Sequence, residues 1–101
     1  MSGYLPIACS LDENEARRRW HEWSDVLGHR LGVVQSATRM TVRFPPSDAL
    51  STKLGELVAA ESLCCGFVDW QLDEQSDGLE LTVSGDPAGV LAIAESFGVA
   101  L

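Results

Sequence analysis

Apolar residues recur along the chain with two periods, and each period predicts one kind of element. Apolar residues at every second position predict strands. The segments with this pattern are residues 4–11, 33–35, 39–44, 68–73 and 79–84. Asp77-Gly78 supplies turn residues between the last two segments, which therefore read as a hairpin. A hairpin between 33–35 and 39–44 is also predicted, although no Asn-Gly turn marks it.

Three further segments carry apolar residues at helical spacing. They begin at Asp12, Ser47 and Asp86, whose side chains can accept hydrogen bonds from the first turn of a helix. Their predicted inner faces are Ala16, Trp20, Trp23 and Leu27 in the first, Leu50, Leu54, Leu57 and Val58 in the second, and Val90, Ala94 and Phe97 in the third. Gly66 and Gly98 suit the position that follows a helix end.

The predicted order is β-α-β(β)-α-β-β-α within a single domain of residues 1–101. Each strand has one apolar and one polar face, whereas strands covered on both sides are apolar throughout. We therefore expect an α+β two-layer sandwich, with a mainly antiparallel sheet of four to five strands and three helices on one face. The outer face of the sheet would carry charged residues, namely Arg39, Arg43, Asp69, Asp73 and Glu80.

The charge of the chain argues against direct nucleic-acid binding, because phosphate neutralisation normally requires a basic surface. The formal net charge is −8, and the basic run Arg17-Arg18-Arg19 reads as a solvated helix face beside acidic residues. The apolar runs are too short to span a membrane, and the N-terminus lacks the pattern of a secretory signal. We therefore expect a cytoplasmic protein with reduced thiols.

Glu61-Ser62-Leu63-Cys64-Cys65 carries the candidate chemistry. At 100° per residue, Glu61 lies about 20° from Leu50, in the middle of the apolar stripe of the second helix. Cys64 falls near −40° and Cys65 near 60°, on either side of the carboxylate. Cys9 occupies the apolar face of the segment 4–11. Three sulfurs and one carboxylate could therefore converge between sheet and helices.

The position of the cysteine pair narrows the chemistry. A helix C-terminus and a neighbouring carboxylate both favour the protonated thiol, which argues against a thioredoxin-like reductase. A bound cation reverses this argument, because the thiols then deprotonate on binding. Soft thiolates select soft ions. Zinc fits three cysteines and one carboxylate or histidine, although structural zinc sites usually space their paired cysteines by two to four residues.

Three short elements resemble a group of small bacterial proteins that occur alone or fused to MerR-type DNA-binding domains. The elements are Glu61-x-x-Cys64-Cys65-x-Phe67, Ala8-Cys9-Ser10-Leu11 and Arg43-Phe44-Pro45. Gly66 stands where several relatives have proline. The resemblance implies a thiol or metal theme and no specific reaction.

The sequence thus predicts a thiol-site domain that binds mercury, arsenite, copper(I) or zinc through Cys9, Cys64 and Cys65, with Glu61 in support. Two alternatives stay open. One is a thiol redox enzyme, including a disulfide switch between Cys64 and Cys65. The other is an interaction or regulatory module in which the cysteines are packing. Where the cysteines are packing, Glu61 would pair with Arg39 or Arg43 or extend into solvent. A homodimer is compatible with the pattern, and His21 and His29 are expected on the surface.

Overall fold

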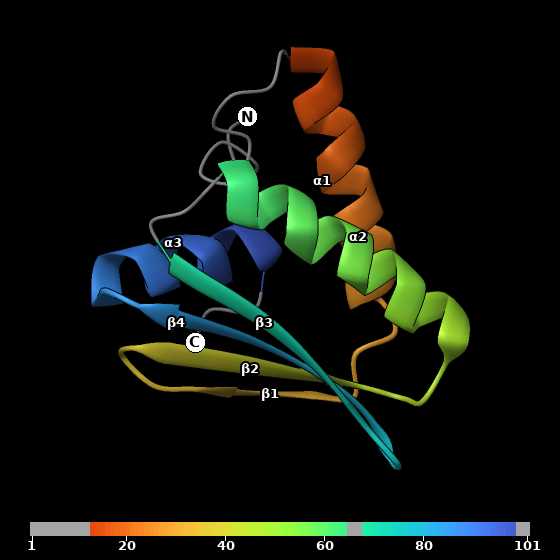
Figure 1. Ribbon diagram of the computed structural model, residues 1–101. Coiled ribbons are helices and arrows are strands. Elements are labelled where there is room, and N and C mark those ends of the chain that lie inside the picture. The colour runs from red at the N-terminus through yellow and green to blue at the C-terminus, as the bar shows by residue number, and fades with distance from the viewer. Residues whose placement is uncertain (1–12, 65–67, 99–101) are drawn as a thin grey trace.

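The computed structural model describes residues 13–64 and 68–98, which form three helices and four strands (Figure 1). The elements in chain order are α1 (Glu13–Leu27), β1 (Gly32–Gln35), β2 (Arg39–Phe44), α2 (Asp48–Cys64), β3 (Val68–Gln75), β4 (Gly78–Gly85) and α3 (Pro87–Phe97). The predicted strand at 4–11, the N-cap Asp12 and the helix-ending Gly66 lie outside the described residues.

The four strands form one antiparallel sheet in the order β1-β2-β4-β3. The hairpin of β1 and β2, which the sequence predicted without a turn signal, is confirmed, and Val33 pairs with Val42. The hairpin of β3 and β4 is also confirmed, although β3 continues to Gln75, two residues beyond the predicted end. With three helices present, the predicted α+β class with a mainly antiparallel sheet is confirmed.

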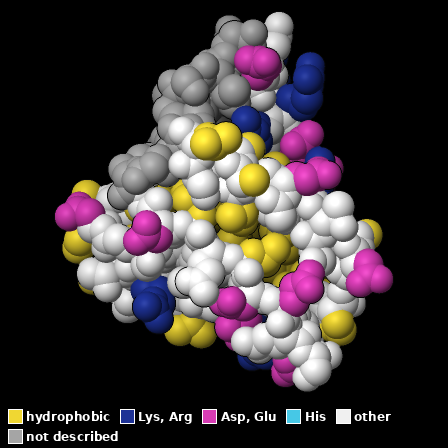
Figure 2. Space-filling model, in the orientation of Figure 1, with side chains coloured by type: hydrophobic (Ala, Val, Ile, Leu, Met, Phe, Trp, Pro, Cys, Tyr) yellow, Lys and Arg dark blue, Asp and Glu magenta, His cyan; other side chains and the backbone are white. Residues whose placement is uncertain are grey.

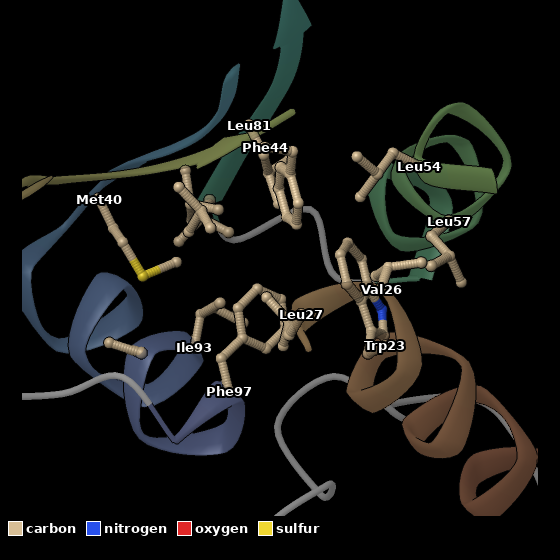
Figure 3. Packing of buried hydrophobic residues seen from close by; sticks show 14 of the residues in the cluster. Trp23, Val26, Leu27, Met40, Phe44, Leu54, Leu57, Leu81, Ile93 and Phe97 are labelled. Carbon is tan, nitrogen blue, oxygen red and sulfur yellow. The ribbon is translucent and has the colours of Figure 1, made fainter. Parts of the chain in front are cut away.

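One face of the sheet is buried, as the alternation predicted. Met40, Val42 and Phe44 of β2 lie opposite Val83, Leu81 and Leu79 of β4, and all six side chains are buried. These residues share one core with side chains from all three helices, among them Trp23, Val26, Leu27, Leu54, Leu57, Val90, Ile93 and Phe97 (Figure 3). Figure 1 shows α1, α2 and α3 gathered above the strands.

The hairpin of β3 and β4 depends on a glycine at its tip. Gly78 has a φ of +154°, a backbone conformation that side chains disfavour. A Cβ atom at this position would lie 2.4 Å from the carbonyl oxygen of Phe44, the last residue of β2. Gly78 therefore lets the hairpin tip close against the end of β2, from which Pro45 and Pro46 lead into α2.

The helix boundaries follow the capping residues that the sequence offers. Ser47 accepts a hydrogen bond from the backbone N–H of Leu50 at 3.2 Å and so caps α2. Asp86 accepts from Ala88 at 3.2 Å and precedes Pro87 in α3. Gly98 ends α3 in the left-handed conformation, with φ 73° and ψ 24°. These predicted ends are confirmed.

Acidic side chains are spread over the face of the molecule shown in Figure 2, around an apolar hollow beneath α2. On this face, the acidic residues that contribute to the net charge of −8 are therefore spread out and are not gathered in one acidic patch. None of the helices in the described ranges has the length and apolar character needed to cross a membrane.

Candidate functional site

Glu61 lies inside the protein, on the face of α2 that packs into the core. Its exposed fraction is 0%, and Leu54 and Leu57, two turns and one turn earlier on the same face, are also buried. The helical period of α2 predicted this placement for Glu61. An ionised carboxylate in such surroundings is costly unless other groups compensate it.

Two side chains of α1 bind one oxygen of this carboxylate. Arg19 donates a hydrogen bond from Nη1 to Glu61 Oε2 at 2.8 Å, and the same two atoms form an ion pair. Trp23 donates from Nε1 to the same oxygen at 3.0 Å. Figure 3 shows the Trp23 indole reaching from α1 toward α2. The carboxylate therefore joins α1 to α2 through two charge-assisted hydrogen bonds.

Arg19 corrects the expectation that the whole basic run is a solvated helix face. Its side chain is 17% exposed, whereas Arg17 and Arg18 are exposed. The suggested alternative partners of Glu61, Arg39 and Arg43, are exposed residues of β2 instead. The sequence did contain an indication that Arg19 faces inward. Arg19 precedes Trp23 by four residues and so lies on the same face of the helix.

The other oxygen of Glu61, Oε1, is buried and differs from Oε2 in its surroundings. Glu61 Oε1 has no hydrogen-bond partner among the residues that the structure describes, while Oε2 accepts two hydrogen bonds. Buried polar atoms in proteins nearly always have a partner, so an unpaired carboxylate oxygen calls for a specific explanation. Chemically, Oε1 can bind a cation, accept a proton or accept a hydrogen bond from a ligand.

The three cysteines cannot be placed around this oxygen from the described residues. Cys64 is the last residue of α2, one turn beyond Glu61, while Cys65 and Cys9 fall outside the ranges described. Within those ranges, no group of three or more His, Cys, Asp or Glu residues could hold a metal ion. The convergence of three sulfurs on Glu61 therefore stays a prediction.

Two aromatic rings from other elements pack against Trp23. Its ring centroid lies 4.7 Å from that of Phe97 in α3 and 5.7 Å from that of Trp70 in β3. Trp23 itself is 1% exposed. Aromatic contacts at these distances stabilise a fixed ring position. Packing against β3 and α3 thus fixes the position of the indole whose N–H donates to Glu61.

The two histidines take no part in this arrangement. His21 and His29 are both exposed, as predicted, and the ring of His21 makes an edge-on contact with Trp20 at 5.8 Å. Comparison of the chain with protein-family models, with curated proteins and with solved structures gives no match. The function has therefore to be argued from the surroundings of Glu61.

Proposed function

We propose that this protein binds a soft metal or metalloid ion through Cys9, Cys64 and Cys65, with Glu61 as the supporting carboxylate. One observation carries the proposal: Glu61 is completely buried, with Oε2 held by Arg19 and Trp23 and Oε1 without a partner in the described part of the chain. A ligand at Oε1 would supply the missing interaction. The resemblance to proteins that occur fused to MerR-type regulators agrees with this proposal.

The cost of burial supports a role for Glu61 beyond stability. A buried ion pair usually contributes little net stability compared with apolar residues of similar volume, because both charges lose their hydration. Glu61 receives compensation at Oε2, while Oε1 has no partner among the described residues. A residue kept only for packing would not need this arrangement, since a leucine at this position would continue the stripe of Leu54 and Leu57.

The end of α2 attracts positive charge. The last turn of α2 contains no basic residue, so the partial negative charge of the helix C-terminus is not offset from within the helix. Cys64 and Cys65 follow Glu61 by three and four residues, the spacing at which side chains of a helix meet. Because Arg19 already neutralises the carboxylate, the preference for soft ions would come from the thiolates.

Titration of the reduced protein with mercury(II), arsenite, copper(I) and zinc tests this proposal. Trp23 provides a built-in signal, because its indole N–H binds the same carboxylate that would meet the ion. We expect the tryptophan fluorescence to change on binding, and Cys64→Ser, Cys65→Ser and Cys9→Ser each to weaken binding by at least about tenfold. Competition with small thiols gives the affinity.

Glu61→Gln and Glu56→Gln form a matched pair on α2, because Glu56 is exposed and Glu61 is buried. We expect Glu61→Gln to weaken binding by about 10- to 100-fold, as for other groups that support metal ligands. Glu56→Gln should leave the affinity unchanged. The proposal fails if binding that depends on the cysteines is no tighter than binding to small free thiols.

A further inference from the structure

The face of the sheet opposite the core has an uncharged row across its centre. Val34 of β1 lies opposite Thr41 of β2, Thr41 lies opposite Thr82 of β4, and Thr82 lies opposite Gln71 of β3. Val34 is 68% exposed and occupies an outward-facing position of the edge strand β1. Short and uncharged side chains therefore form a strip that runs over all four strands.

Charged residues flank this strip and are separated by sign. Arg39 and Arg43 project from β2, while acidic residues occupy the other half of the face, namely Asp69 and Asp73 on β3 and Glu80 on β4. Arg43 and Glu80 lie opposite each other across β2 and β4, at 3.9 Å. One half of the outer face is thus basic and the other half acidic, in spite of the net charge of −8.

We propose that this face binds a second copy of the chain, with a two-fold axis parallel to the strands between β2 and β4. Such a rotation carries β4 of the partner over β2, and β3 of the partner over β1, because the strand order is β1-β2-β4-β3. The basic half of one sheet then covers the acidic half of the other. An axis across the strands would instead place β2 over β2 and bring arginines together.

The proposed rotation also matches the cross-strand register. Arg43 would meet Glu80 of the partner subunit, because Arg43 and Glu80 already share one row. Thr41 would lie over Thr82 of the partner subunit, next to the axis. Arg39 would approach Asp69 of the partner subunit from the neighbouring strand. The same surface thus complements itself, as a two-fold interface requires, and sheets pack face to face in this way in β-sandwiches.

The size of the face sets the expected affinity. Four strands about 4.8 Å apart, with about 3.4 Å per residue along β2, give a plane of roughly 19 by 20 Å. This plane of about 380 Å² per chain is roughly half of the area that each partner buries in a standard interface, so the contact would be weak and transient. Two chains of charge −8 also repel each other. We therefore expect a reversible dimer with a Kd in the micromolar range, and this inference does not depend on the proposed metal site.

Sedimentation of the full chain over about 1 µM to 1 mM, a range that brackets a weak interface, tests the dimer. An ionic strength of about 0.15 M screens the long-range repulsion between the chains. Thr41→Lys adds two like charges beside the axis, and we expect it to raise the dimer Kd by about tenfold or more. Thr52→Lys, on the exposed side of α2, adds the same charge elsewhere and should leave the Kd unchanged.

A charge swap supplies a second test that does not require Thr41→Lys to fold. Arg43→Glu and Glu80→Arg should each weaken the dimer, because each places like charges together, and the double variant should restore it. Circular dichroism checks that each variant keeps the native fold. A monomer throughout the concentration range would overturn the proposal. It would also be overturned if Thr41→Lys, correctly folded, dimerised as well as the unmodified chain.

Discussion

Two arginine–glutamate pairs in the described part of the chain, Arg19–Glu61 and Arg43–Glu80, lie in very different surroundings. In the first, the Glu61 side chain is 0% exposed and the nitrogen–oxygen distance is 2.8 Å. In the second, Glu80 is 31% and Arg43 52% exposed, and the distance is 3.9 Å. Water competes for the second pair, whereas it reaches the first only through Arg19, which is 17% exposed. The same combination of arginine and glutamate therefore contributes differently to stability in the two places.

The difference shows what an ion pair can contribute in each place. At the surface, the pair mainly determines how the outer face presents its charge to another molecule. In the interior, Glu61 has lost all contact with water and Arg19 most of it, so removal of Arg19 leaves the buried carboxylate largely uncompensated. The buried pair is thus expensive to disturb even though it adds little net stability. We expect the largest stability effects at Arg19 and the smallest at Glu80.

Arg19→Ala should have the largest effect, because it leaves the buried Glu61 carboxylate with the Trp23 N–H as its remaining described donor. We expect a loss of about 3–5 kcal/mol in the free energy of unfolding, measured by urea denaturation. Arg18→Ala is the matched control, since Arg18 is the exposed neighbour in the same helix, and it should cost at most about 0.5 kcal/mol. Equal losses in the two variants would contradict the described role of Arg19.

Trp23→Phe removes the indole N–H and keeps an aromatic ring between α1 and α3. We expect a loss of about 1–3 kcal/mol, because Glu61 Oε2 loses one of its two hydrogen bonds and the smaller ring packs less well. Thermal unfolding followed by circular dichroism measures it. Trp20→Phe, one turn earlier and half-buried, is the control and should cost less. If Trp20→Phe were the more damaging change, the hydrogen bond to Glu61 would not matter.

The double change Arg19→Met and Glu61→Leu separates stability from function. Replacement of a whole buried ion pair by apolar residues of similar size is often neutral, so we expect a change of about 1 kcal/mol or less. The same variant should lose soft-ion binding, because Glu61 Oε1 is gone. Urea denaturation and metal titration of one preparation check both outcomes. A loss of stability as large as that of Arg19→Ala would show that the pair itself stabilises the fold.

Glu80→Gln should have the smallest effect of the four. Because the Arg43–Glu80 pair is long and solvated, we expect a change of at most about 0.5 kcal/mol in the unfolding free energy at low protein concentration. Urea denaturation at two salt concentrations measures the electrostatic part. A loss of more than about 1 kcal/mol would mean that this surface pair behaves like the buried one.

The sequence predicted the parts of the fold that depend on local periodicity. Leu54 and Leu57 lie where the helical period puts them, and so does Glu61, because the position on a helix face depends on the spacing alone. The partner of Glu61 was not predicted, since Arg19 is 42 residues away and the contact depends on how α1 crosses α2. The strand at 4–11 and the three-sulfur centre remain predictions, because Cys9 and Cys65 lie outside the described ranges.

The tip of the β3–β4 hairpin has a mechanical consequence for the far end of α2. Gly78 closes against Phe44, so the hairpin braces the short connection from which α2 starts. A helix of 17 residues is about 26 Å long, and a tilt of about 5° at its start would displace Cys64 by about 2 Å, close to a full metal–sulfur bond length. The contact of Glu61 with Arg19 lies one turn before Cys64. It therefore ties α2 to α1 near the C-terminal end of α2. At the proposed soft-ion site, this second anchor would limit the displacement of the end of α2.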